Sequence, residues 1–183
     1  MSAPDAHSPS APLSPATVVV GAGRPPRAPG APVNVPIELS STYAAWPAEG
    51  PDLTPASTGY GRYDNATWAA FEQVVGALEG GRALCFASGM AAISAAVAAL
   101  PAAGAIVVPR TPYNTSRALF LQLQEAGREI RWVDLDDTAA TVAALEGATA
   151  AWLESPSNPL MQVADLPTLI AAARAHGVVI GCD

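Results

Sequence analysis

The sequence contains no lysine, and this absence excludes several kinds of site before any motif is considered. Its basic side chains are nine arginines against 16 acidic residues, which gives a formal net charge of −7. A phosphate-binding loop of the type G-x-x-x-x-G-K-[ST] requires a lysine, so the sequence cannot contain one. It also has no basic cluster that would neutralise nucleic-acid phosphates, and a nucleic-acid partner is not expected.

Histidine and cysteine are equally scarce. His7 lies in a proline-rich stretch, and His176 precedes Gly177 at the expected end of a helix, where a cation is favourable. Without a cluster of histidines, cysteines and carboxylates, the sequence predicts neither a metal site nor a Ser-His-Asp triad. Cys85 and Cys182 each lie in an apolar stretch, which predicts two buried, reduced thiols rather than a disulfide framework.

Long apolar runs are missing as well. None approaches the 18 or so residues of a membrane helix, and the N-terminus lacks the charged and then apolar order of a secretory signal. We therefore expect a cytoplasmic protein with no membrane partner.

The first 36 residues hold nine of the 18 prolines, which predicts a disordered or extended arm. Within it, Val18 to Gly23 imitates the start of a dinucleotide-binding fingerprint, but Pro25 and Pro26 stand where its helix should continue. Residues 37–66 are rich in turn-forming residues and predict an extended or looped segment.

From residue 67 the pattern becomes regular. A helix is predicted over 67–78, ended by Gly80, and strands then alternate with helices. This alternation predicts an α/β domain with a parallel sheet covered on both faces. The final apolar run ends at the last residue, so we expect the chain to be part of a longer domain. The predicted strands are 83–87, 105–109, 129–134, 149–153 and 178–182; the predicted helices are 89–100, 114–127, 138–146 and 165–176.

A first candidate site is the strand-to-helix turn at Ser88, Gly89 and Met90. Small residues there let an anion approach the free N–H groups at the helix start. The same residues would also allow close packing of the helix on a sheet, and the motif alone does not separate the two. A second candidate is the loop with Tyr60 and Arg62, since arginine suits a phosphate and a phenol adds a donor.

A third candidate is the loop from Glu154 to Pro159, which follows a predicted strand and so lies at the carboxyl edge of the sheet, where ligands bind. We expect Asn158 to be buried there, either bonding a ring oxygen or bracing the turn. Asp183 ends the next strand at the same edge. Its carboxylate could keep a pyridinium nitrogen protonated, or could simply cap a turn.

In their order and wording, these segments resemble the pyridoxal-phosphate (PLP) enzymes of cysteine and methionine metabolism, such as cystathionine γ-synthase, cystathionine γ-lyase and β-lyase, methionine γ-lyase and the O-acylhomoserine sulfhydrylases. The resemblance runs from about Val33 to Asp183. It rests on Pro36-Ile37, Ser40-Ser41-Thr42-Tyr43, Tyr60-x-Arg62, Leu78-Glu79-Gly80-Gly81, Ser88-Gly89-Met90-Ala91-Ala92-Ile93, Glu154-Ser155-Pro156-Ser157-Asn158-Pro159 and Asp183.

The resemblance implies the PLP-dependent transferase fold of type I, with 67–183 as the first part of the PLP-binding large domain. In that fold the segment 83–87 pairs with strands that come late in the chain. We therefore expect the other four strands to form one parallel sheet without it. Residues 37–66 would contact a neighbouring subunit, so that the active site belongs to a dimer and the full-length protein is a homotetramer.

The resemblance also implies a role for each candidate residue. Ser88, Gly89 and Met90 would bind the PLP phosphate, and Tyr60 and Arg62 would reach the phosphate of the neighbouring subunit. Tyr113 would stack on the cofactor ring and assist proton transfer, Asn158 would lie near the ring hydroxyl, and Asp183 would pair with the pyridine nitrogen. The chain departs from the family pattern at Asn114-Thr115, where a glycine pair is usual, and at Ala66, where proline is usual.

The implied activity is γ-replacement or γ-elimination on sulfur amino acids or homoserine esters. Because the chain lacks the lysine that holds PLP as a Schiff base, we expect the 183-residue stretch to be inactive on its own. Two alternatives stay open at this stage. One is a non-enzymatic α/β module that binds a phosphate ligand, and the other is a degenerate partner subunit.

Overall fold

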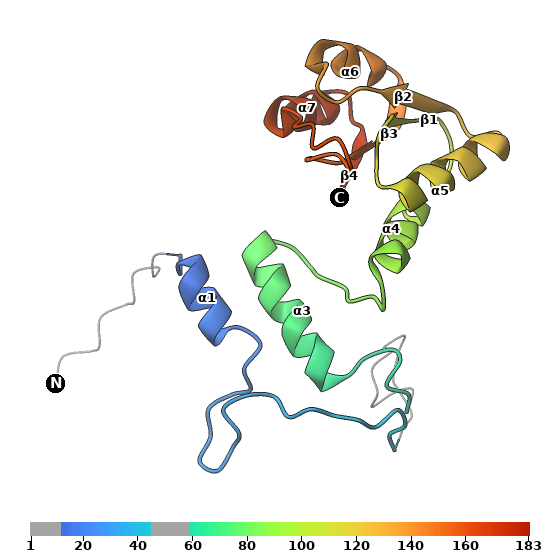
Figure 1. The fold of residues 1–183 in the computed structure, drawn as a ribbon. Coiled ribbons are helices and arrows are strands. Elements are labelled where there is room, and N and C mark those ends of the chain that lie inside the picture. Colours follow the sequence, from blue (N-terminus) through green and yellow to red (C-terminus); the bar gives the residue numbers. More distant parts are fainter. Residues whose placement is uncertain (1–11, 45–58) are drawn as a thin grey trace. The chain divides into compact units, whose positions relative to one another are not determined.

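The computed structural model describes residues 12–44 and 59–183, which form two units divided after Cys85 (Figure 1). The first unit ends at Cys85 and the second begins at Phe86. Within the described ranges, no helix combines the length and the apolar character needed to cross a bilayer.

The second unit is built on a four-stranded parallel sheet in the order β2-β1-β3-β4. Its strands are β1 (Ala105–Pro109), β2 (Ile130–Val133), β3 (Ala148–Leu153) and β4 (Val179–Cys182). Four of the five predicted strands are therefore confirmed, together with their parallel arrangement. Residues 83–87 form no strand, as the resemblance implied.

Four helices cover the two faces of this sheet: α4 (Gly89–Ala98), α5 (Asn114–Glu125), α6 (Thr138–Ala144) and α7 (Leu166–Ala175). Side chains of β1 alternate between the faces, as the strand geometry requires. Ile106 and Val108 pack with residues of α4 and α5, whereas Ala105 and Val107 pack with residues of α7 and the end of α6. Both faces of β1 are thus buried, which explains its uninterrupted apolar sequence.

The chain order across the sheet creates a switch point between β1 and β3. From β1 the chain passes through α5 to β2 on one side, and then returns through α6 to β3 on the other side of β1. In open parallel sheets, ligands bind outside the carboxyl ends of the strands at such a reversal. The loops that follow β1 and β3 are therefore the first place to look for a site.

Strand β4 lies at the edge of the sheet and is much less buried than β1 or β3. Its Gly181 lies against the ring of Trp152, and a Cβ at this position would come within 2.5 Å of the Trp152 Cε3 atom. Because Trp152 is almost fully buried and cannot easily move, glycine is required by the close approach of the two strands.

The first unit contains the helices α1 (Pro15–Gly21) and α3 (Ala66–Glu79), which contact each other. Helix α1 corrects the prediction of a disordered or extended arm over residues 15–21. Ser14 caps the helix, Pro15 occupies a first-turn position where it needs no N–H, and the next proline comes only after the helix has ended. Because 18–20 is helical, the rejection of a dinucleotide-binding strand there is confirmed.

The polar residues around Asn65 hold the rest of the first unit. Asn65 is buried and caps α3 by accepting a hydrogen bond from the Thr67 N–H at 2.9 Å, while its Nδ2 donates to the Tyr43 hydroxyl at 3.0 Å. The Tyr43 N–H donates to the Gly59 carbonyl at 2.8 Å, and Thr42 forms an antiparallel bridge with Tyr60. The segment that ends at Tyr43 is thereby tied to the loop that carries Tyr60.

Both cysteines are exposed, so the prediction of buried thiols is wrong. Cys85 lies in a segment that forms no strand, and its N–H donates to Glu72 of α3 at 2.6 Å. Cys182 lies on the edge strand β4. Val178 and Ile180, near Cys182, pack against the core, but the Cys182 side chain itself is exposed.

Candidate functional site

A buried glutamate joins the two loops at the switch point. Glu154 directly follows β3, is only 6% exposed, and accepts a hydrogen bond from the Tyr113 N–H through its Oε2 at 2.8 Å. Tyr113 ends the loop that follows β1. This hydrogen bond therefore joins the loops after β1 and β3 at the carboxyl edge of the sheet, where the topology predicts a ligand site.

Tyr113 stands at the entrance to α5. It is the N-cap residue of that helix, its side chain makes no capping hydrogen bond, and it is 43% exposed. The phenol is thus available at the edge of the sheet while its backbone is held by Glu154. Asn114 and Thr115, which replace the glycine pair of the resembling family, form the first turn of α5 and have no left-handed backbone conformation.

The carboxyl edge is electronegative. Burial raises the pKa of Glu154 above its ordinary value and the negative charge of Asp183 adds to this, whereas hydrogen bonds from the N–H groups of Tyr113 and Asn158 oppose it. Burial likewise raises the pKa of the Cys182 thiol, with smaller contributions from Asp183 and Glu154. A cation placed at this edge would relieve the repulsion between the two carboxylates.

The loop after β3 is held by its own serines. The Ser155 hydroxyl accepts from the Ala164 N–H at 3.0 Å, and the buried Ser157 accepts from the Gln162 N–H at 3.1 Å. Asn158 is exposed, which corrects the expectation that it is buried. The buried polar side chains of this loop are Glu154 and Ser157, because they face the sheet while Asn158 lies on the solvent side.

Asp183 follows β4 at the same edge. Its N–H donates to the Leu153 carbonyl at 2.9 Å, which continues the pairing of β4 with β3. Asp183 is therefore placed beside Glu154 by the parallel register. Its side chain is exposed.

The start of α4 provides donors for an anion. Ser88 is the N-cap residue, and its Oγ accepts from the Ala91 N–H at 3.1 Å. The N–H groups of Gly89 and Met90 belong to the first turn and have no partner within the helix. A Cβ added at Gly89 would meet no atom within 4 Å, so there is open space at this helix start.

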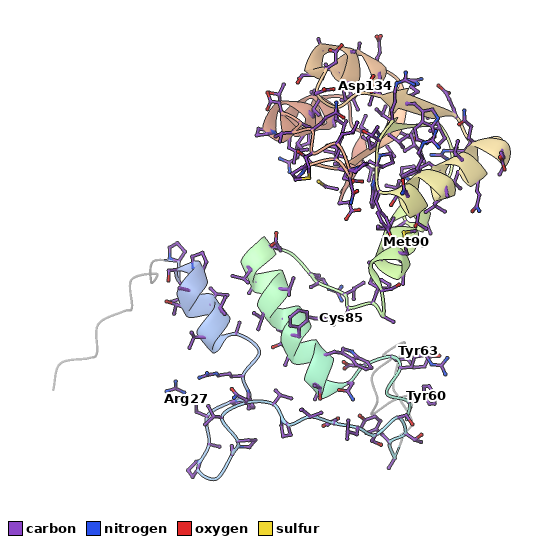
Figure 2. The ribbon with its side chains drawn as sticks, viewed as in Figure 1. Arg27, Tyr60, Tyr63, Cys85, Met90 and Asp134 are labelled. Atoms are coloured by element: carbon purple, nitrogen blue, oxygen red, sulfur yellow. The ribbon has the colours of Figure 1, made fainter. Side chains whose placement is uncertain are left out.

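Tyr60 and Arg62 belong to the first unit, on the loop that precedes α3, where Tyr63 also lies; Met90 marks the first turn of α4 in the second unit (Figure 2). The Arg62 guanidinium lies over the Tyr60 ring, with its central carbon 4.6 Å from the ring centre. Arg62 is exposed and, within the described residues, forms no ion pair. The structure thus brings Tyr60 and Arg62 together as one group and brings Ser88 to Met90, Tyr113, Asn158 and Asp183 into the other unit.

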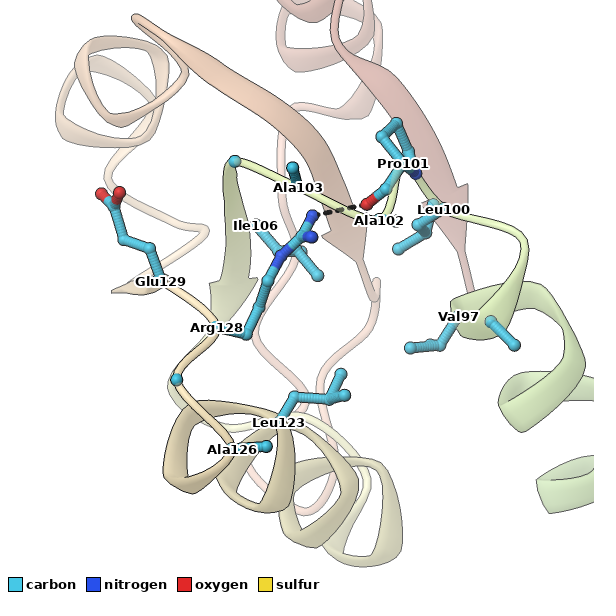
Figure 3. Close-up of a pocket in the computed structure, with 13 residues that line it drawn as sticks. Val97, Leu100, Pro101, Ala102, Ala103, Ile106, Leu123, Ala126, Arg128 and Glu129 are labelled. Atoms are coloured by element: carbon cyan, nitrogen blue, oxygen red, sulfur yellow. Dashed lines mark hydrogen bonds between the residues drawn. The ribbon is translucent and has the colours of Figure 1, made fainter.

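A cavity of about 640 Å³ lies at the opposite, amino-terminal edge of the sheet (Figure 3). It is lined mainly by apolar residues such as Val97 and Leu123, and Arg128 crosses it to donate to the Pro101 carbonyl at 2.6 Å. Arg128 is therefore engaged in holding the loop before β1. Across residues 12–44 and 59–183, no three histidine, cysteine or acidic side chains are grouped so that they could hold a metal.

Glu154 is the buried charged residue of this edge to which the sequence analysis gave no role. Its loop was recognised, but the role was assigned to Asn158 alone. The available signal was its position directly after a buried apolar strand, at the switch point of the sheet. A carboxylate there is costly unless the fold supplies donors for it, and that cost indicates a function.

Comparison with known proteins agrees with this architecture. Residues 16–183 match the model of the family described as Cys/Met metabolism PLP-dependent enzyme. A probable cystathionine gamma-synthase of Herpetosiphon aurantiacus is 33% identical over 168 residues, which cover 89% of this chain and 51% of that protein. A putative cystathionine gamma-lyase of Streptomyces coelicolor is 38% identical over 130 residues, covering 68% of this chain and 33% of that protein.

A solved structure shows the same fold. The cystathionine gamma synthase of Xanthomonas oryzae pv. oryzae, crystallised in complex with cystathionine, superimposes with a TM-score of 0.79 at 30% identity, covering 94% of this chain and 45% of that one. The chain thus spans about half, or less, of the length of these relatives. It belongs to the family of PLP-dependent enzymes of cysteine and methionine metabolism.

Proposed function

We propose that the full-length protein carrying this chain is a PLP-dependent transsulfuration enzyme. It acts on sulfur amino acids or homoserine esters by γ-replacement or γ-elimination. The observation that carries the proposal is the carboxyl edge of the second unit, where Tyr113, Glu154 and Asp183 meet at the switch point of the sheet. The relatives named as cystathionine gamma-synthase, cystathionine gamma-lyase and O-succinylhomoserine sulfhydrylase support the same class of reaction.

The residues present suit the cofactor of the family. The start of α4 offers backbone N–H groups at Gly89 and Met90, the Ser88 cap and open space, which fit a phosphate without needing a cation. The carboxylates of Glu154 and Asp183 make the sheet edge electronegative, which fits a ring nitrogen that carries a proton. An anion site and a cation site in one unit match the two ends of PLP.

Each residue then has a defined task. When bound, PLP supplies an electron sink for the carbanions that form during elimination and replacement. Asp183 would hold a proton on the pyridine nitrogen, and Asn158 would donate to the ring hydroxyl. Tyr113 would lie against the ring face, and its exposed phenol would carry a proton to or from the substrate.

The first unit completes the site of a second subunit. Arg62 is exposed, and its guanidinium lies over the Tyr60 ring, so a phosphate from outside the chain can approach it. On this basis the active site belongs to a dimer, with a homotetramer as the complete protein and residues 37–66 at the subunit contact. The two free cysteines are consistent with a cytoplasmic enzyme.

The proposal is tested with the purified full-length protein. We expect it to bind PLP with the absorbance of a cofactor joined to a lysine, and to turn over cystathionine or an O-acylhomoserine. The 183-residue chain expressed alone has no lysine and should show no turnover. PLP binding without turnover on any of these substrates would favour a non-enzymatic module or a degenerate partner subunit instead.

The shared site is tested by mixing subunits. Arg62→Ala should weaken PLP retention, and mixing this variant with one that lacks the lysine should restore part of the activity, because one hybrid site is then intact. Mixtures that assemble but stay inactive would show that Arg62 does not serve a neighbour. Arg27→Ala, which removes an arginine elsewhere in the first unit, is the matched control and should not change PLP retention.

A further inference from the structure

Glu154 is connected to two segments that the proposed site uses. Its carboxylate accepts the Tyr113 N–H at 2.8 Å from the loop after β1, and Glu154 itself begins the loop after β3, four residues before Asn158. One side chain therefore ties the backbone of Tyr113 to the start of the loop that carries Asn158. In the proposed function, the Tyr113 phenol and the Asn158 side-chain amide both contact the cofactor ring.

No cation balances this carboxylate. Within residues 12–44 and 59–183 the recorded ion pairs do not include Glu154, and the titratable groups that face it are Asp183 and Cys182. A buried carboxylate is stable only where hydrogen-bond donors replace water, and here the Tyr113 N–H does so at 2.8 Å. This distance is that of a well-formed hydrogen bond, and it joins the two loops at Glu154.

Other links between the two loops are weaker. The Thr111 hydroxyl donates to the Gln162 Oε1 at 3.4 Å, which is long for a hydrogen bond. Tyr113 makes no capping bond with its own side chain, and its phenol is exposed. The Tyr113 carbonyl accepts from the Arg117 N–H within α5 at 2.9 Å, so Glu154 is the link between the Tyr113 backbone and the loop after β3.

We propose that Glu154 is a positioning residue, whose carboxylate fixes the separation between the Tyr113 phenol and the Asn158 amide at the cofactor ring. This inference rests on the proposed function. Glu154 touches neither the cofactor nor the substrate in this role. It acts through the two residues that do, and losing it should loosen both together.

The experiment compares the full-length protein with its Glu154→Gln and Glu154→Asp variants. Glutamine keeps the shape but turns a donor toward one of the two N–H groups, and aspartate keeps the charge but is one methylene too short. Asp136→Asn is the matched control, because Asp136 is an exposed carboxylate at the same edge that bonds the Gln162 side chain. All four proteins are prepared with and without PLP.

The first measurement is hydrogen exchange in the protein without PLP. The amides of Tyr113 and Asn158 should exchange about ten times faster in both Glu154 variants, while amides inside β1 and β3 remain protected. The second is steady-state kinetics of the loaded protein. The kcat should fall by about ten-fold or more, with KM and PLP retention changed by less than about three-fold. Asp136→Asn should match the wild type in both.

The outcomes separate the two proposals. A wild type that does not bind PLP would overturn the proposed function and the positioning role with it. If the wild type binds PLP but exchange at both amides is unchanged in the variants, the positioning role alone is wrong. Loosened amides with an unchanged kcat would also overturn it, since Glu154 would then serve only the stability of the edge.

Discussion

The two units of the chain are stabilised by different means. In the second unit, β1 is buried on both faces and Phe120 of α5 is fully buried between α5 and the sheet, close to Trp152. In the first unit, α3 buries only Gly76, and large apolar side chains stay in solvent, such as Leu39 at 92% exposed and Phe71 at 60%. The second unit has a hydrophobic core, whereas the first has a network of polar side chains around Asn65.

The difference indicates what each unit requires. A parallel sheet covered by helices encloses a hydrophobic core of its own. A helix and extended segments with exposed apolar residues do not, and such surfaces mark contacts with other parts of a protein. This agrees with the proposal that residues 37–66 contact a neighbouring subunit.

The largest difference between the two units is expected when a phenylalanine in each is replaced by alanine. Phe120→Ala removes a fully buried ring, and we expect the free energy of unfolding of the full-length protein to fall by about 3 to 5 kcal/mol. Phe71→Ala removes an exposed ring and should change it by less than about 0.5 kcal/mol. Urea unfolding followed by circular dichroism measures both. Equal losses of stability would remove the distinction between the units.

A second prediction concerns glycines. Gly181→Ala places a methyl group within 2.6 Å of two Trp152 ring atoms, so the unfolding free energy should fall by about 1 to 3 kcal/mol. Gly81→Ala, at the end of the first unit, meets no atom within 4 Å and should be close to neutral. Thermal unfolding of the two variants side by side gives the answer. A neutral Gly181→Ala would mean that Trp152 can move aside.

A third prediction tests the polar network of the first unit. Asn65→Ala removes the cap of α3 and the bond to Tyr43, and the cost should be about 1 kcal/mol. Hydrogen exchange should increase at residues 36–44 and at the start of α3, and not in the sheet. Asn158→Ala, at an exposed asparagine, is the control and should leave both the exchange pattern and the unfolding free energy unchanged.

The smallest expected effect is a pH dependence. Burial raises the pKa of Glu154 in the folded state, so folding favours its protonated form. The stability that this group contributes is present below the ordinary glutamate pKa and is lost as the pH rises through the raised value. Glu154→Gln does not titrate, so its unfolding free energy should gain on that of the wild type between about pH 4 and pH 7. The reverse slope would mean that the two N–H bonds outweigh burial.

Most of the strands and helices could be predicted from the sequence, because their apolar patterns are distinct. Uninterrupted apolar runs such as 105–109 located the buried strands, because a strand covered on both faces is apolar throughout. Helix α1 was missed because the prolines around it dominated the pattern, although Ser14 and Pro15 are a standard helix start. The signals for a helix start were present in the sequence, but the high proline content of the first 36 residues was given more weight.

Burial at the sheet edge could not be predicted in the same way. Asn158 was expected to be buried and Glu154 was given no role. In the structure Asn158 is exposed and Glu154 is buried. Which side chain of a loop turns inward depends on the neighbouring loop, here on the Tyr113 N–H that reaches Glu154. The cysteines were misjudged for a related reason, since an apolar neighbourhood in sequence does not show whether a strand lies at an edge.

The direct passage from β3 into Glu154 limits how this protein can vary in length. Trp152 and Leu153 pack on opposite faces of the sheet, and Glu154 follows without a spacer. Because neighbouring strand residues point to opposite faces, inserting or deleting one residue between Ala148 and Glu154 would exchange the faces and withdraw the carboxylate from Tyr113. Changes in length are tolerable instead in the exposed turn at residues 159–161, beyond Asn158. Evolution can therefore lengthen or shorten this turn, while the count of residues in β3 is held constant by core and site together.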